Sequence, residues 1–287
     1  MTFAPLTAAA LLSDLDARLV GQSITCLPEC DSTNDRARAA AEAGAPDGAV
    51  ILAEVQTSGR GQRGRVWLAP PGACLLMSTI LRPQLPAADA HLLTMLAACA
   101  TAAAVESVAD LACPLKWPND LVVGERKVGG ILVETSFLGD ALEYAVVGIG
   151  LNVNLDVGLY PEIAETATSL ARELGTEVDR IAVARELLRQ LDRRYARLGR
   201  GLGEEVYREW RRRLGTLGRQ VVVVDHRGEA EAVLAEDVAP DGALIARRAD
   251  GSRRMLRLGE VSLSQPISTS TRTCPSRNRP SAGPGGW

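Results

Sequence analysis

The spacing of apolar and polar residues predicts helices separated by strands. Apolar residues recur at helical spacing over residues 5–20, which predicts an amphipathic helix. A second helix is expected to begin at Ser32 or Thr33, residues suited to an N-cap, and to end at Gly44. Further helices are expected at residues 87–108, 181–198 and 204–214.

Strand patterns begin at residue 49. Residues 49–55 form a nearly continuous apolar run, typical of a strand buried on both faces, and strand character resumes over residues 74–81. Gly124 and Gly139 stand where hairpin turns would join three later runs rich in β-branched residues. Those runs predict a mostly antiparallel set of strands at residues 121–123, 128–134 and 142–151.

The C-terminal part of the chain predicts a separate β module and a tail. Short strand-like segments divided by turn sequences predict a small barrel. Residues 266–287 contain almost no apolar residue and are expected to be disordered. The fold class is therefore α+β with an appended β module, whose strands are expected at residues 221–224, 231–235, 243–246 and 255–258.

Composition and charge limit the classes of function. The formal net charge is −3, so the chain lacks the overall basic character typical of nucleic-acid-binding proteins. The six cysteines lack the paired short spacing of a zinc site, and we expect reduced, buried thiols. Charges interrupt the first apolar run too early for a secretory signal, and no uninterrupted apolar stretch approaches the roughly 20 residues of a membrane span. We expect a cytoplasmic protein with no DNA or membrane partner.

Three glycines alternate with cations in the loop Gly59–Arg65, which has the sequence GRGQRGR. Glycines let the backbone approach a ligand closely, and guanidinium groups neutralise phosphate or carboxylate. The loop has neither the Walker A pattern nor the glycine spacing of a dinucleotide-binding motif. It predicts an anion-binding loop, with a flexible surface loop as the alternative.

The segment Lys116–Asp120, KWPND, comes directly before an apolar strand, where a loop that enters a sheet commonly carries a site. Asn119 and Asp120 supply hydrogen-bond acceptors. Asp120 is also suited to holding a metal ion that bridges the phosphates of a nucleotide. A capped turn is the alternative interpretation.

Lys127 precedes Gly129 and Gly130, whose missing side chains leave room for a flat or narrow ligand. Glycines also alternate with apolar residues ahead of Asn152, whose amide offers donors and an acceptor. The alternatives are a solvated turn lysine and a strand whose glycine face is closely packed.

Five motifs follow one another over residues 30–155: Ser32-Thr33-Asn34, Gln56 ahead of the Gly/Arg loop, Lys116–Asp120, Lys127–Glu134 and Gly148–Asn152. In this order they resemble the biotin protein ligase family, and the resemblance extends to about Leu263. It implies a catalytic domain over residues 1–216, in which helices flank a mixed sheet. An SH3-like barrel over residues 217–265 and the tail over 266–287 would follow.

The resemblance implies a ligase that uses ATP, biotin and Mg²⁺. Biotin and Mg-ATP would give biotinyl-5′-adenylate and pyrophosphate. A lysine ε-amine of a biotin carboxyl carrier domain would then attack the mixed anhydride to give an amide. The acceptor would belong to an acyl-CoA or pyruvate carboxylase, and the enzyme would be a monomer or a homodimer.

Carried over by position, the resemblance assigns roles to the site residues. Arg60 and its neighbours would close over biotin and adenylate, Lys127 would contact the biotin carboxylate and the α-phosphate, and Asp120 would help to hold Mg²⁺ through the nucleotide. The catalytic residues would be Lys127, Arg60, Asp120 and Lys116. Biotin would be bound by Ser32, Thr33, Asn34, Gln56, Arg60, Gly61, Gln62, Lys127, Gly129 and Gly130, and ATP by Arg63, Arg65, Trp67, Lys116, Asn119, Lys127 and Asn152.

Two features depart from the family pattern. Gln62 stands where the family's loop most often has arginine, which removes a cation. Either Arg63 supplies that charge, which we favour, or the enzyme holds its adenylate less tightly. Only about 30 residues precede Ser32, too few for the winged helix-turn-helix of bifunctional members, so a DNA-binding repressor is not expected. The main alternative is a lipoate ligase or lipoyl/octanoyl transferase, against which the Gly/Arg loop and Lys116–Asp120 argue.

Overall fold

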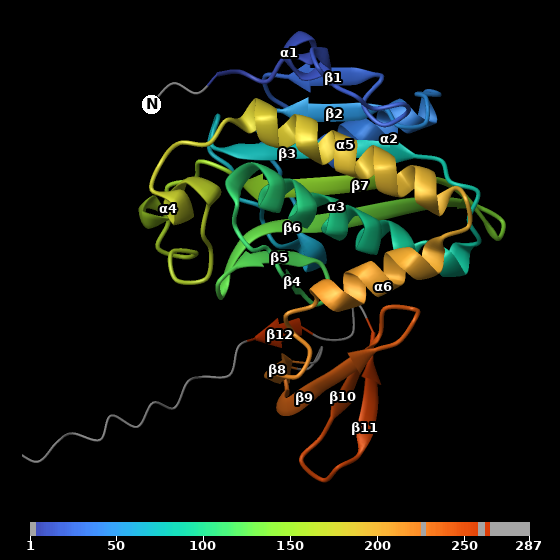
Figure 1. Ribbon diagram of the computed structural model, residues 1–287, viewed down its shortest axis with the longest axis vertical. Coiled ribbons are helices and arrows are strands. Elements are labelled where there is room, and N and C mark those ends of the chain that lie inside the picture. Colours follow the sequence, from blue (N-terminus) through green and yellow to red (C-terminus); the bar gives the residue numbers. More distant parts are fainter. Residues whose placement is uncertain (1–3, 225–227, 258–261, 265–287) are drawn as a thin grey trace, which may run out of the picture.

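The larger part of the molecule is a seven-stranded sheet with helices on both faces (Figure 1). In this computed structural model, residues 4–224, 228–257 and 262–264 are described, with only the backbone of Arg63 and of residues 262–264. The strand order is β1-β2-β3-β7-β6-β5-β4; β1 and β2 are parallel and the other pairs are antiparallel. The strands are β1 (Ile24–Leu27), β2 (Val50–Ala53), β3 (Cys74–Leu81), β4 (Leu115–Lys116), β5 (Asp120–Val123), β6 (Arg126–Leu138) and β7 (Ala141–Asn152).

Alternating side chains along the strands supply both faces of this sheet. Val50 and Leu52 of β2 belong to the main core with the helices α3 and α5, whereas Ile51 packs with Ala37 and Ala41 of α2. Successive residues of a strand point to opposite faces, so one apolar run serves two helical layers. The helices are α1 (Ala8–Leu12), α2 (Thr33–Glu42), α3 (His91–Ala109), α4 (Leu170–Leu174), α5 (Arg180–Leu198) and α6 (Gly203–Arg213), with 3₁₀ turns η1 (Gln62–Gly64), η2 (Ala87–Asp89) and η3 (Val157–Leu159).

A five-stranded antiparallel sheet follows α6 as a separate small module (Figure 1). The end of β9 and the turn that follows it contact the larger part. The indole N–H of Trp117 donates to the Gly242 carbonyl in the turn (2.9 Å), and the Tyr207 hydroxyl donates to the Val238 carbonyl at the end of β9 (2.7 Å). The module therefore touches the segment Lys116–Asp120 directly. In the order β11-β10-β9-β8-β12, its strands are β8 (Gln220–Val224), β9 (Ala230–Val238), β10 (Leu244–Arg247), β11 (Arg253–Leu256) and β12 (Ser262–Ser264).

The predicted α+β class is confirmed, with a mixed sheet flanked by helices and a small β module after it. The strand expected over residues 49–55 is Val50–Ala53, and it is buried throughout. Gly124 and Gly139 occupy the predicted hairpin turns with φ of 60° and 62°. The predicted disordered tail, residues 266–287, lies outside the described residues.

The helix predicted over residues 5–20 is wrong beyond Leu12. There α1 ends, Asp14 takes a φ of 60°, and the Asp192 carboxylate on α5 accepts hydrogen bonds from the backbone N–H groups of residues 18–20 at 2.8–3.0 Å. This carboxylate satisfies donors that a continued helix would have paired internally. It lies more than 170 positions along the chain, so local spacing could not reveal it.

Among the described residues, the short strands β1, β4 and β12 and the short helix α4 lie where no strand or α-helix was predicted. Where β1 lies, the sequence predicts only an apolar link. The strand exists because Ile24–Leu27 pairs in parallel with Val50–Ala53. Segments of two to five residues carry too little periodicity to be recognised without their partners.

By length and composition, residues 87–109 could cross a membrane, and this helical stretch is the one such candidate in the part of the chain that the structure describes. However, 72% of its most apolar window is buried inside the protein. Leu93, Leu96 and Val105 of α3 belong to the main core. The stretch therefore has the burial of a central core helix.

The described cysteines are free thiols, and all of them are buried as expected except Cys26, which is half-buried; Cys274 lies outside the described residues. Burial is the main cause that raises their pKa values. The pKa reaches about 12 for Cys74, Cys99 and Cys113.

We expect this burial to weaken the fold at alkaline pH. A thiol in an unfolded chain has a pKa of about 8.5, so the stabilising contribution is complete below that pH and is lost as the pH rises toward 12. From pH 7.5 to 9.5, the three most shifted thiols should each lower the free energy of unfolding by about 1 kcal/mol. Urea unfolding at both pH values measures the change. The Cys74→Ala/Cys99→Ala/Cys113→Ala variant is the control; an equal pH dependence in that variant would contradict the explanation.

Candidate active site

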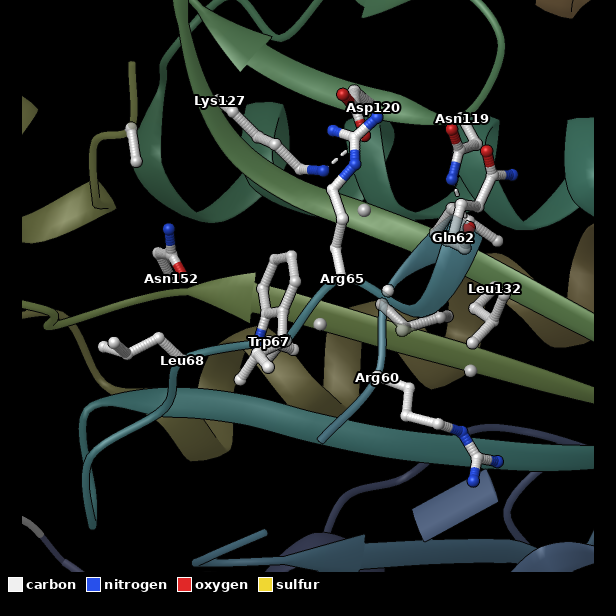
Figure 2. A pocket seen from close by; sticks show the side chains of 18 of the residues that line it. Arg60, Gln62, Arg65, Trp67, Leu68, Asn119, Asp120, Lys127, Leu132 and Asn152 are labelled. Atoms are coloured by element: carbon white, nitrogen blue, oxygen red, sulfur yellow. Dashed lines mark hydrogen bonds and ion pairs between the residues drawn. The ribbon is translucent and has the colours of Figure 1, made fainter. Parts of the chain in front are cut away.

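A cavity of about 560 Å³ lies beside β3, β6 and β7. Small-molecule sites typically measure about 300–1,000 Å³. Figure 2 shows residues of its lining, which come from the N-terminus of α2, the Gly/Arg loop, the segment Lys116–Asp120 and the two long strands β6 and β7. The cavity brings together most of the predicted site residues: Ser32, Thr33, Asn34, Gln56, Arg60, Gly61, Gln62, Arg65, Trp67, Lys116, Asn119, Asp120, Lys127, Gly130 and Asn152.

Gly129 is not part of this lining. A Cβ at Gly129 would lie 3.1 Å from Leu151 and 3.3 Å from Leu121, both in the core, whereas one at Gly130 would approach Lys127 Nζ at 3.2 Å. Because successive strand residues face opposite sides, only the second glycine of the pair borders the cavity. The side chain of Arg63 is outside the described part of the structure.

The N-terminus of α2 builds a buried polar floor. The backbone N–H and the hydroxyl of Thr33 both donate to Gln56 Oε1, at 2.7 and 2.9 Å. The Ser78 hydroxyl lies 2.8 Å from Thr33 Oγ1 and 2.7 Å from Asn34 Oδ1, and the Asn34 amide donates to Glu134 Oε2 at 2.7 Å. Satisfied buried networks of this kind hold one arrangement. The floor is therefore preformed, and the sequence analysis had not included Ser78.

Two glycines of β7 make room for the walls of the cavity. A Cβ at Gly148 would overlap the Asn34 side-chain oxygen, and one at Gly150 would lie 2.6 Å from Trp67 Cε2. The floor residue and the indole therefore both rest on bare backbone. For the glycines ahead of Asn152, the sequence left ligand contact and close packing as alternatives. The glycine face of β7 is closely packed and also borders the cavity.

The Gly/Arg loop is folded back on itself. The Gly61 N–H donates to the Arg65 carbonyl (2.7 Å), and the Trp67 N–H donates to that of Gly59 (2.9 Å), with η1 at the tip. The Arg60 guanidinium extends away from Lys127 and Arg65 (Figure 2) and makes two hydrogen bonds, of 2.7 and 2.8 Å, to Asp35. These bonds raise the pKa of Arg60 above its usual value. This predicted site cation is thus paired on the first turn of α2.

Lys127 and Asp120 form an ion pair at the cavity wall. Lys127 Nζ lies 2.5 Å from Asp120 Oδ1 and 5.5 Å from the centre of the Trp67 ring. Arg65 extends from the loop toward the same end of the cavity (Figure 2). The buried indole N–H of Trp67 has no hydrogen-bond partner among the described residues. This end of the cavity therefore combines cations with an aromatic ring.

Asn119 and Asn152 are both buried and use their amides on the protein itself. The Asn119 amide donates to the Ile131 carbonyl (2.5 Å), and the Asn152 amide donates to the Thr168 carbonyl (3.0 Å). Asn119 thereby fastens the segment Lys116–Asp120 to β6. Each asparagine is held in position before any ligand binds.

Sequence reasoning missed the wall formed by residues 163–167. Ile163, Glu165, Thr166 and Ala167 line the cavity, although their segment carries no motif. They reach it through a parallel bridge to Lys127, whose N–H donates to the Thr166 carbonyl at 2.8 Å. No signal in the sequence links positions so far apart.

The arrangement can hold an anion next to a flat, partly polar group. Lysine and arginine side chains border a small-walled cavity whose floor offers hydrogen bonds. Among the described residues there is no group of three or more His, Cys, Asp or Glu that could form a metal site of its own. A metal ion here would therefore depend on ligand oxygens as well as on the protein.

Two family matches cover the two parts of the molecule. Residues 27–152 match the Biotin/lipoate A/B protein ligase family, and residues 216–264 match the Biotin protein ligase C terminal domain. The chain is 33% identical over 243 residues to the biotin--[acetyl-CoA-carboxylase] ligase of Paracoccus denitrificans, an alignment that covers 82% of this chain and 98% of the relative.

The chain is also similar to a longer bifunctional protein and to a protein of known structure. The chain is 36% identical over 182 residues to the bifunctional ligase/repressor BirA of Bacillus spizizenii. This alignment covers 63% of the chain but only 56% of the relative. The chain thus spans little more than half of that protein. It is similar in fold to the biotin protein ligase of Aquifex aeolicus in complex with biotin and ATP, with a TM-score of 0.71, 27% identity and coverage of 85% and 100% of the two chains.

Proposed function

Because this chain belongs to the biotin protein ligase family, we propose that it activates biotin with ATP and transfers it to a lysine of a biotin carboxyl carrier domain. In the first step a biotin carboxylate oxygen attacks the α-phosphorus of ATP. An acyl-phosphate bond forms, the bond to the β-phosphate breaks, and pyrophosphate leaves. In the second step the lysine ε-amine attacks the acyl carbon, AMP leaves, and the amine loses a proton.

The observation that carries the proposal is the Lys127–Asp120 ion pair, which lies near the Trp67 ring in a cavity partly lined by glycines. The first step brings two anions together, so it needs a cation held in place. Preorganised charges in a site that excludes water stabilise the charge that develops in the transition state. We assign Lys127 to the biotin carboxylate and the α-phosphate, which would take the place of Asp120 as its partners.

The floor suits an uncharged, hydrogen-bonding head group. Ser32, Thr33, Asn34 and Gln56 line the cavity next to small residues, and we assign the biotin head to them. Gly61, Gln62 and Gly130 would complete this end. Arg60 would leave Asp35 when the loop closes over the ligand. ATP would contact Arg63, Arg65, Trp67, Lys116, Asn119, Lys127 and Asn152, and the proposed catalytic residues are Lys127, Arg60, Asp120 and Lys116.

Asp120 also fits the chemistry of Mg²⁺. This ion prefers oxygen ligands and commonly uses one or two carboxylates with substrate phosphates rather than an all-protein cage. The cavity lining includes the carboxylates of Asp120, Glu125 and Glu165, but among the described residues no group of three or more His, Cys, Asp or Glu could hold a metal ion by itself, which matches that pattern. A bound Mg²⁺ would neutralise phosphate charge, while Asp120 would hold it and Lys127 would stay at the reacting oxygens.

The relatives support the remaining parts of the proposal. One is named for ligation to acetyl-CoA carboxylase, and one solved structure contains biotin and ATP. The name of the first relative supports a carboxylase carrier domain as acceptor. Within that class we propose an acyl-CoA or pyruvate carboxylase, and we propose a monomeric or homodimeric cytoplasmic enzyme without a DNA or membrane partner. Residues 1–216 would be the catalytic domain and residues 217–265 the SH3-like domain.

The decisive experiment measures exchange of pyrophosphate into ATP and transfer to a carrier domain. Wild-type protein with Mg²⁺ should catalyse exchange with biotin but not with lipoate, and should biotinylate the carrier lysine. Lys127→Met removes the cation and keeps the stem, so exchange should fall about 100-fold or more. Arg208→Met, which breaks an exposed ion pair on α6, is the control. Exchange that responds to lipoate instead of biotin would refute the assignment.

Gln62 decides a separate question about retention of the intermediate. If Arg63 replaces the charge missing at position 62, then Gln62→Arg should leave the rate of biotinyl-5′-adenylate release unchanged within about twofold. If the enzyme holds the adenylate loosely, the added cation should slow release by about tenfold, the effect of roughly 1.4 kcal/mol. Release is measured by trapping the free adenylate with hydroxylamine, and retention that does not improve would exclude the loose-binding alternative.

A further inference from the structure

Lys127 is held by a segment that lies outside every motif of the sequence. Its N–H donates to the Thr166 carbonyl and its carbonyl accepts from the Thr168 N–H, both at 2.8 Å. In β6 the pairing with β7 begins only at Gly129. At Lys127, residues 166–168 therefore hydrogen-bond to the edge of β6 that pairs with β7 from Gly129 onward.

Glu173 on α4 joins this segment to β6. Its Oε1 accepts a hydrogen bond from Arg126, the neighbour of Lys127, at 2.6 Å, and another from the Thr168 hydroxyl. The side chain of Glu173 is 19% exposed, and Thr168 is fully buried. The Thr168 carbonyl in turn accepts from Asn152. One carboxylate thus links the backbone around Lys127 to the residue that holds Asn152.

We infer that Glu173, with Thr168 and Arg126, forms a positioning clamp that sets where Lys127 meets its ligands. The inference rests on the proposed function for the role of Lys127. Glu173 and Thr168 do not line the cavity. Arg126 does, but its guanidinium pairs with Glu173. Small displacements of a reacting group cost large factors in rate, so the clamp acts on the chemical step rather than on biotin affinity.

The test compares Glu173→Ala with Glu209→Ala. Glu209 is a matched control: its side chain is 17% exposed and pairs with Arg194 and Arg213, and it does not line the cavity. Glu173→Ala should lower kcat for exchange about 10- to 100-fold, with KM for biotin within about threefold. In a Lys127→Met background the same change should have little further effect. Glu173→Gln, which keeps an acceptor oxygen, should restore part of the loss.

Hydrogen exchange supplies a readout that does not depend on activity. In ligand-free protein the amides of Lys127 and Thr168 should exchange at least tenfold faster in Glu173→Ala than in Glu209→Ala. Equal exchange, or a kcat loss that is fully additive with Lys127→Met, would overturn the clamp. Wild-type protein without biotin-dependent exchange of pyrophosphate would instead refute the proposed function.

The two lysines carry a second, independent inference. The chain has 32 lysine and arginine residues, of which only Lys116 and Lys127 are lysine, and both line the cavity. Arginine keeps its proton and is not a nucleophile at neutral pH, whereas a lysine amine attacks mixed anhydrides. The ammonium group of Lys127 is ion-paired with Asp120 before ligand binds, and in the proposed complex it would be ion-paired with ligand oxygens instead.

We propose that this distribution protects the ligase from acylation by its own adenylate, and this too rests on the proposed function. Self-acylation would form an amide bond to a lysine of the chain, break the bond from the acyl carbon to the phosphate oxygen, release AMP and lose the amine proton. With arginine as the cation at every other basic position, the described surface outside the cavity offers no lysine for this reaction.

Introducing a lysine tests the protection. Val66 is 84% exposed on the Gly/Arg loop at the cavity, and Arg208 is exposed on α6, away from its lining. With biotin, ATP and Mg²⁺ but no carrier, Val66→Lys should acquire biotin at that lysine at least tenfold faster than Arg208→Lys acquires it, measured by peptide mass spectrometry. If Val66→Lys biotinylates the carrier but not itself, the scarcity of lysine is compositional and the proposal fails. Wild-type protein that does not biotinylate the carrier would refute the proposed function.

Discussion

The site depends on close contact between bare backbone of β7 and two side chains from distant segments. Gly148 and Gly150 leave no Cβ where Asn34 and Trp67 lie. Asn34 lies in the first turn of α2, whose N-terminus forms the floor, and the backbone of Trp67 closes the Gly/Arg loop by its hydrogen bond to Gly59. A methyl group at Gly148 would displace Asn34, and one at Gly150 would displace Trp67. Both side chains are packed or hydrogen-bonded, so neither could move aside without disturbing its surroundings.

The residues of the apolar core and the residues of the cavity lie in different parts of the sheet. The main core lies where α3, α5 and α6 cover one face, and α2 packs on the other with a smaller apolar cluster. The N-terminus of α2 stands beside the point where β3 and β7 carry small or hydroxyl residues. Ser78 of β3 and Gly148 of β7 are register partners, so the sheet brings the hydroxyl and the glycine to the same floor.

Two cations of the site are paired with carboxylates: Arg60 with Asp35 and Lys127 with Asp120. Binding an anionic ligand then exchanges one anionic partner for another, which costs less than stripping water from an isolated cation. The clamp through Glu173 is of a different kind, because it fixes the backbone and not the charge. Charge and position are thus supplied by separate residues.

The sequence by itself determined the α+β class, the positions of the longer strands and their hairpin turns, and part of the cavity lining, because periodicity, glycine turns and ordered motifs are local properties. Only the tertiary structure decided that residues 13–20 are not helical, that Gly130 rather than Gly129 borders the cavity, and that residues 163–167 form a wall. Each of these depends on a partner far along the chain: the Asp192 carboxylate, the facing of β6, and the bridge to Lys127. Long-range hydrogen bonds and packing leave no periodic trace in the sequence, so three-dimensional contact alone could establish them.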